Sequence, residues 1–197
     1  MHLLLPAPIL KRLRRELRRA GRREIGGLLM GEHVAEGVFR VVDVSVQRRG
    51  GSHGHFVRDP ANHNRQLQGF FDRVGRDFTR FNYLGEWHSH PTFAPAPSTV
   101  DVATMRSLVA DSSVGVNFLV LLIVRLIAPM TMEGTATVFA EGMTPMPVSV
   151  ACEQQEPNTC LARVARWLRP SSDVTIEMRE FEMDSFQAES TSEDDDK

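Results

Sequence analysis

Two histidines and an aspartate in the middle of the chain have the types and the spacing of metal ligands. His88 and His90 are separated by one residue, and Asp101 follows them after a loop. On a β-strand, residues at i and i+2 point to the same side of the sheet, so both imidazoles can reach one ion. Two imidazoles and one carboxylate make three protein ligands, which is the number that a catalytic zinc site uses when its fourth position is left for water. The spacing therefore predicts a metal centre with an open position.

Each half of this pattern also has a purely structural interpretation. An isolated His-x-His pair is common on polar surface. Ser98 and Asp101 have the spacing of a capping box, in which Ser98 is the N-cap of a helix and Asp101 its N3 residue. No cysteine lies near the segment to close a structural zinc shell, because the two cysteines of the chain are Cys152 and Cys160. The presence of both halves together favours the metal interpretation.

The elements around these residues must bring the ligands together. Residues 83–87 suit a strand that carries both histidines at its C-terminal end. The prolines Pro91, Pro95 and Pro97 predict a stiff loop after that strand. A helical pattern begins at Ser98, so the carboxylate in its first turn can come back toward the histidines.

The other segments alternate between helix and strand. One apolar stripe predicts a helix over residues 8–20, and a second stripe predicts a helix that begins at Asp59-Pro60 and continues through Phe81, with His63 exposed near its start. The continuous apolar run at 116–127 is typical of a central strand that is buried on both faces. Further strands are predicted over residues 24–31, 38–46, 135–140 and 148–152. This order of elements predicts an α/β fold.

The complete pattern resembles the JAMM (JAB/MPN) metalloprotease family. Members have an upstream Glu in a short apolar strand, then H-x-H-P, a spacer and S-x-x-D. This chain has Glu24 at the start of 24–31, His88-Ser89-His90-Pro91, and Ser98 to Asp101. The resemblance covers roughly residues 8–150. It implies a three-layer α/β sandwich whose mixed central sheet is flanked by helices, akin to the cytidine deaminase sheet.

The resemblance also implies a role for each site residue. One zinc ion per chain would be held by His88, His90 and Asp101. Glu24 would be the general base, which takes a proton from water and delivers it to the leaving amine. Ser98 would donate a hydrogen bond to the developing oxyanion. No separate cofactor-binding residue is implied.

The implied activity is that of a zinc-dependent isopeptidase or peptidase acting on a ubiquitin-like protein or its conjugates. The residues 85–87 before the first histidine resemble the bacterial branch of the family, which is found beside E1- and E2-like proteins, commonly in antiphage defence. Two alternatives stay open: a non-catalytic MPN scaffold, which typically lacks zinc ligands, and a DNA-repair-associated JAB relative. A zinc nucleobase deaminase would need H-x-E and P-C-x-x-C motifs, and neither occurs here.

Length and composition suggest one domain with an appendage. Among the 197 residues we expect a catalytic domain over 1–155, an appendage over 156–182 and an acidic disordered tail over 183–197. In the appendage, residues 158–169 predict a short helix and the alternating residues 174–178 predict a possible strand. The net charge is −2, but positive and negative charges are concentrated in different parts of the chain. Residues 11–23 carry eight Lys and Arg, whereas residues 180–197 carry eight Asp and Glu. The basic run has no interleaved aromatics, so nucleic-acid binding is not favoured.

The chain shows no sequence signal for export or membrane insertion. Two cysteines are too few for a disulfide framework and fit a reducing cytoplasm. The first ten residues lack the order of a signal peptide. The longest apolar stretch, 116–128, contains Asn117 and Arg125. It is also shorter than the ~20 residues that a membrane helix needs. We therefore expect a cytoplasmic protein without a membrane partner.

Overall fold

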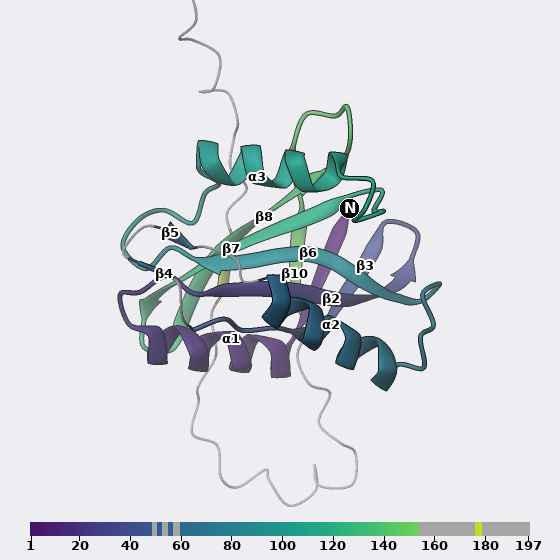
Figure 1. Ribbon diagram of the computed structural model, residues 1–197. Coiled ribbons are helices and arrows are strands. Elements are labelled where there is room, and N and C mark those ends of the chain that lie inside the picture. The colour runs from purple at the N-terminus through teal and green to yellow at the C-terminus, as the bar shows by residue number, and fades with distance from the viewer. Residues whose placement is uncertain (49–50, 53–54, 57–59, 154–175, 179–197) are drawn as a thin grey trace, which may run out of the picture.

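The computed structural model describes residues 1–48, 51–52, 55–56, 60–153 and 176–178 (Figure 1). In that part of the chain a mixed sheet has the strand order β10-β1-β3-β2-β6-β7-β8-β11, with β9 beside β8. The helices are α1 (Ala7–Ala20), α2 (Pro60–Arg73) and α3 (Thr99–Ala110). The strands of the sheet are β1 (His2–Pro6), β2 (Gly26–Ala35), β3 (Val38–Val44), β6 (Phe81–Ser89), β7 (Leu119–Ala128), β8 (Thr131–Phe139), β9 (Met146–Pro147), β10 (Ser149–Glu153) and β11 (Ile176–Met178). A separate ladder joins β4 (Gly51–Ser52) to β5 (His55–Phe56).

The prediction of a mixed α/β fold is confirmed. The predicted helix over 8–20 is α1, and the apolar run at 116–127 contains β7, whose residues 119–124 are all buried. The finer expectation of a three-layer, deaminase-like sandwich stays a prediction. Strand β1 was not predicted, because so short a segment at the chain start does not show a period. It is held by parallel pairing with both β10 and β3.

Strand pairing in the middle of the sheet fixes the position of the candidate site. Strand β6 runs antiparallel to β2 and parallel to β7. In this register Gly26 lies opposite His88, so the start of β2 meets the end of β6. The segment that precedes β2 is therefore carried to the histidines, although it lies far from them in sequence.

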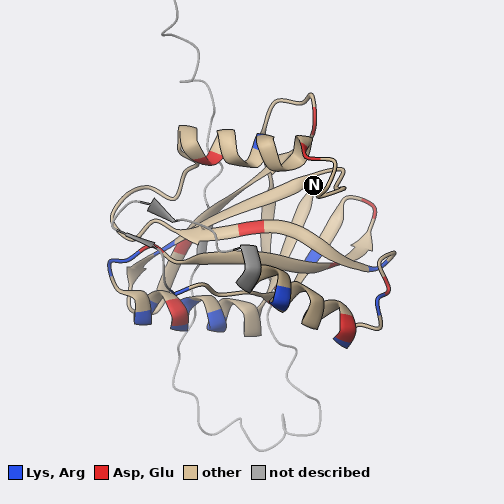
Figure 2. Cartoon of the chain, viewed as in Figure 1, with Lys and Arg blue, Asp and Glu red and all other residues tan. Residues whose placement is uncertain are grey.

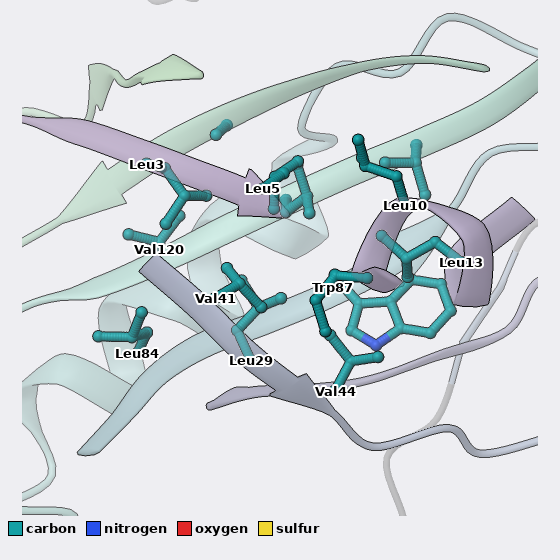
Figure 3. Close-up of a cluster of buried hydrophobic side chains, with 14 of the residues drawn as sticks. Leu3, Leu5, Leu10, Leu13, Leu29, Val41, Val44, Leu84, Trp87 and Val120 are labelled. Atoms are coloured by element: carbon teal, nitrogen blue, oxygen red, sulfur yellow. The ribbon is translucent and has the colours of Figure 1, made fainter. Parts of the chain in front are cut away.

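Apolar clusters pack each of the three helices against the sheet. Helix α1 contributes Leu13, which lies beside Trp87 in the larger cluster, and Leu29 of β2 belongs to the same cluster (Figure 3). Helix α3 packs Met105 and Val109 against alternate β7 side chains in a second cluster. Fully burying an aliphatic or aromatic side chain of this size contributes about 1.5–3 kcal/mol relative to leaving it exposed. The strand that carries the histidines is thus packed against buried apolar side chains.

The predicted second helix is wrong at its C-terminal end. Helix α2 ends at Arg73, and the chain then passes through Gly75 and Arg76, which have φ values of 69° and 57°. The amide of Arg76 donates to the carbonyl of Phe71 at 2.9 Å, which closes the helix as in a Schellman motif. Phe78 is therefore outside the helix and 53% exposed, and Phe81 begins β6.

The prediction of an exposed His63 is also wrong. His63 is 1% exposed, and its Nδ1 lies 2.9 Å from Ser45 Oγ while its Nε2 lies 3.0 Å from Gln47 Oε1. The amide of Leu28 donates to the same Ser45 Oγ at 2.7 Å. Gln47 Oε1 can only accept, so His63 Nε2 carries the ring proton and Ser45 donates its hydroxyl proton to His63 Nδ1. This chain of hydrogen bonds joins α2 to β2.

Several expectations fall on other parts of the chain. The alternating residues around 176 do form a strand, β11, which pairs with β8. The helix expected over 158–169 and the tail expected over 183–197 lie outside the described residues. No helix in the described ranges is both long and apolar enough to cross a membrane.

Candidate metal centre

His88 and His90 face each other at the end of β6. Their Nε2 atoms are 3.0 Å apart and both side chains are buried. The amide of His90 donates to the carbonyl of Val124 on β7 at 3.0 Å, so the strand geometry continues through the second histidine. This is the same-side arrangement that the i, i+2 spacing predicts.

The loop after β6 fixes the tautomer of His90. Its Nδ1 lies 2.8 Å from the carbonyl oxygen of Ala94, which can only accept a hydrogen bond. Nδ1 therefore carries the proton, and the lone pair of Nε2 is free on the side of His88. A backbone carbonyl in this position is a common orienting partner of a metal-binding imidazole.

Asp101 divides its carboxylate between a helix cap and the histidines. Ser98 caps α3, and its amide and hydroxyl both donate to Asp101 Oδ2 at 2.7 Å. The other oxygen, Oδ1, lies 3.6 Å from His88 Nε2. One ligand atom each from His88, His90 and Asp101 lies within 4.8 Å of the others. The capping box and the metal-ligand interpretations are therefore compatible, since they use different oxygens.

Glu24 is held beside this group by the end of β6. The amide and carbonyl of the next residue, Ile25, bond to Ser89: Ile25 N–H donates to Ser89 Oγ at 3.0 Å, and Ser89 N–H donates to Ile25 O at 2.9 Å. Glu24 is 4% exposed, and its Oε1 has no hydrogen-bond partner among the described residues. Burial, together with repulsion from the Asp101 carboxylate, raises the pKa of Glu24 to about 7.

Burial keeps the two imidazoles neutral. It lowers the pKa of His88 to about 4, although the charge of Asp101 acts in the opposite direction. Burial also lowers the pKa of His90, while the hydrogen bond to Ala94 and the charge of Asp101 oppose the shift. Neutral imidazoles have lone pairs available for a metal ion at neutral pH.

Ser98 is exposed at the mouth of the site. Its hydroxyl proton is directed at Asp101 Oδ2, and its oxygen accepts the Asp101 amide at 3.2 Å. An oxyanion role would require the hydroxyl to turn from Asp101 toward a substrate. The helix-cap role is visible in the structure, whereas the catalytic role of Ser98 stays a prediction.

Two contacts in the site were not foreseen from the sequence. Ser89 stands between the two histidines and points to the opposite face of the strand, where it holds Ile25. The alternation of side chains along the strand was the sequence signal from which the opposite orientation of Ser89 could have been predicted. Phe93 packs its ring 4.3 Å from the ring of His90 and is 41% exposed. Phe93 therefore gives the His90 ring an apolar neighbour.

Comparison with known proteins shows the family of the chain. Residues 6–139 match the family model described as prokaryotic homologs of the JAB domain. The chain belongs to this family. The match begins at the end of β1 and extends through β8, so it contains Glu24 and the three candidate ligands. A search of curated proteins found no match.

A solved structure shares the fold of this JAB domain. The solution structure of a protein from Desulfitobacterium hafniense superposes with a TM-score of 0.58 and 22% sequence identity. The similarity covers 79% of this chain and 95% of that chain. At this identity the likeness supports the fold and nothing finer.

The residues of the site fit a zinc ion. Two neutral imidazoles and a carboxylate are a donor set that zinc takes in open catalytic sites. The unpartnered Glu24 Oε1 is a second reason, because a buried polar atom without a partner costs free energy unless a further group binds there. The described residues thus provide three candidate ligands and one adjacent buried carboxyl group.

Proposed function

We propose that the protein is a zinc-dependent isopeptidase or peptidase. The observation that carries the proposal is the convergence of His88, His90 and Asp101 beside a buried Glu24 whose carboxylate oxygen has no partner among the described residues. A structural zinc site would close its shell with a fourth protein ligand and would need no adjacent base. Three ligands and a base are the parts that amide hydrolysis requires.

Each residue has one task in this proposal. A zinc ion, when bound by the two histidines and Asp101, would supply a Lewis acid that polarises a carbonyl and acidifies water. Glu24 accepts a proton from the attacking water and passes it to the leaving amine. A pKa of about 7 suits both steps, because the group gains and loses a proton readily at neutral pH. Ser98 turns its hydroxyl toward the oxyanion.

The substrate class follows from the resemblance of the JAMM motif and its bacterial context. We infer that the enzyme removes or processes a ubiquitin-like modifier with a glycine-ended tail, in a cytoplasmic conjugation pathway with E1- and E2-like partners that serves antiphage defence. Genes for E1- and E2-like proteins beside this one would support the pathway.

A non-catalytic scaffold is the second candidate function. A scaffold places no demand on the metal ligands or on an unpartnered buried glutamate, so the presence of all these groups favours the enzyme. The DNA-repair-associated relative is the third, and the Glu24 strand favours the protease over it.

The proposal is tested with the zinc-loaded protein and a fusion substrate. The substrate is a ubiquitin-like protein with a C-terminal glycine, joined through that glycine to the ε-amine of a lysine peptide. We expect a single cut after that glycine, detected by mass spectrometry, and its loss with a zinc chelator. A variant of the fusion with the last glycine changed to Phe is the matched control and should resist cleavage. Full cleavage in the presence of the chelator would contradict a zinc enzyme.

A further inference from the structure

Helix α1 presents a stripe of cations to solvent. Lys11, Arg15, Arg18 and Arg22 recur at steps of four, three and four residues and are all exposed, so they lie along one face of the helix and its exit. Figure 2 shows basic positions along α1. The opposite face carries the buried leucines that pack on the sheet. We refer to these four residues as the α1 stripe.

Most of the α1 stripe has no counter-charge in the described structure. Arg15 bonds Glu16 at 3.2 Å, and that carboxylate is shared with Arg19 and Arg48. Lys11, Arg18 and Arg22 take part in no ion pair within the described residues. A row of like charges on one helix face repels itself, so an anionic partner stabilises it.

The counter-charge is in the same chain. Residues 1–153 contain 18 Lys and Arg and 14 Asp and Glu, a net charge of +4. Residues 154–197 contain 5 and 11, a net charge of −6, and these two values sum to the −2 of the whole chain. Eight of the acidic residues lie in the last eighteen, including the run Glu193 to Asp196. The net negative charge of residues 154–197 is therefore larger than the net positive charge of residues 1–153.

The chain is long enough for its acidic end to reach the α1 stripe. Strand β11 pairs with the start of β8, and Ile176 lies opposite Met132. Arg14 of α1 donates to the carbonyl of Met130 in the preceding turn at 3.4 Å, so α1 passes close to this hairpin. The segment that follows Met178 spans up to roughly 60 Å when it is fully extended. Helix α1 is only about 21 Å long, from its rise per residue.

We propose that the acidic C-terminal segment 180–197 docks intramolecularly on the α1 stripe. Each exposed ion pair is weak, but several pairs act together, and the tether gives an effective concentration in the millimolar range. Arg22 of the stripe precedes Glu24 by two residues, so one end of the stripe is close in sequence to the candidate metal centre. The proposal does not depend on the chemistry of that centre.

The lysine content of the chain allows a specific test. A carbodiimide joins an amine directly to a carboxyl group, and the chain has two lysines, Lys11 in the stripe and Lys197 at the end. The full chain is treated at low salt, digested and analysed by mass spectrometry. We expect a link between Lys11 and carboxyl groups of residues 180–197. Its yield should fall at least about five-fold at 0.5 M salt, where the screening length is only about 4 Å.

Variants separate the docked segment from other partners of Lys11. Glu193→Gln with Asp194, Asp195 and Asp196→Asn should remove most of the link, and Arg18→Gln with Arg22→Gln should lower it although Lys11 is unchanged. As a matched control, Glu36→Gln with Glu141→Gln neutralises exposed acids elsewhere and should leave the yield unchanged.

Two outcomes would overturn the proposal. The first is a Lys11 link only to residues 1–153, or none at all. The second is a link between two chains in a mixture of isotopically light and heavy protein, which would assign the stripe to a second copy.

Discussion

Ser98 and Asp101 bind each other through three hydrogen bonds at the start of α3. The amide and the hydroxyl of Ser98 donate to Asp101 Oδ2 at 2.7 Å, and the amide of Asp101 donates to Ser98 Oγ at 3.2 Å. This arrangement leaves Asp101 Oδ1 facing His88 at 3.6 Å. The helix cap therefore orients a candidate metal ligand, and local folding and chemistry depend on the same serine.

Ser98→Ala separates these two functions of the serine. Loss of the cap should lower the free energy of unfolding by about 1 kcal/mol. Loss of an oxyanion donor should lower kcat by roughly 10²–10³. Urea unfolding and cleavage kinetics measure the two effects, and Ser98→Thr, which keeps a hydroxyl and a cap, should restore most of both. A destabilised variant with normal kcat would show that Ser98 is a cap and not a catalyst.

The candidate ligands should determine the zinc content of the purified protein. We expect about one zinc per chain in the wild type, and most of it lost in His88→Ala or Asp101→Ala, because each variant removes one of three protein ligands. His2→Ala changes an exposed histidine on β1 and should keep the metal. Metal analysis that finds full occupancy in the His88→Ala, His90→Ala double variant would refute this site.

The raised pKa of Glu24 predicts a pH dependence of stability in the metal-free protein. The usual pKa is 4.5, and the value in the folded chain is about 7. Between these values the folded chain holds a proton that the unfolded chain has released, so the free energy of unfolding falls as the pH rises. Glutamine does not titrate, so the free energy of unfolding of Glu24→Gln does not fall in this way as the pH rises.

The comparison of metal-free wild type and Glu24→Gln isolates this effect, because the contributions of the histidines cancel in the difference. We expect the stability of Glu24→Gln relative to wild type to rise from pH 4.5 to pH 8 and to stay constant below pH 4.5. Urea unfolding at several pH values measures it. Glu36→Gln, at an exposed turn, is the matched control variant. A pH-independent difference for Glu24→Gln would mean that Glu24 is solvated.

The buried His63 should contribute to stability and not to metal binding. His63→Ala leaves the buried Ser45 hydroxyl without its acceptor. Leaving a buried polar group unsatisfied in this way should lower the free energy of unfolding by about 2 kcal/mol. Asn64→Ala, at the exposed neighbouring position, is the control. Unchanged stability in His63→Ala would show that the hydrogen-bond chain to β2 is dispensable.

Local patterns predicted the elements whose signals lie within a few residues. The leucine spacing of α1 and the Ser98 cap of α3 are examples, since both depend on contacts within one helix. Gly75 was an available stop signal for α2, but the aromatic spacing of Phe78 and Phe81 obscured it. The positive φ of Gly75 and Arg76 ended the helix although the apolar period continued.

Long-range pairing determined the positions of Glu24 and His63, which the sequence pattern alone could not predict. Glu24 reaches the histidines because Gly26 pairs with His88 across β2 and β6, and no periodicity encodes that register. His63 is buried because its partners, Ser45 and Gln47, come from a separate segment that follows β3. The resemblance to a known motif supplied the Glu24 assignment, whereas the structure supplied its environment.

Removal of residues 183–197 tests where the catalytic domain ends. The family match ends at residue 139, well before this segment. We therefore expect normal zinc content and normal cleavage of a small model substrate in the truncated protein. Complete loss of activity would show that the tail belongs to the catalytic unit.

Glu24→Gln in the zinc-loaded protein tests the central claim most directly. Glutamine matches glutamate in shape but cannot accept the proton of water, so the chemical step alone should fail. Zinc content by mass spectrometry and cleavage of the modifier fusion are measured on the same samples, with Glu36→Gln as the matched control. The account predicts that Glu24→Gln binds zinc like the wild type, binds the fusion and does not cleave it. A zinc-bound variant that cleaves normally, or a variant that has lost its zinc, would contradict the assignment of Glu24 as the base.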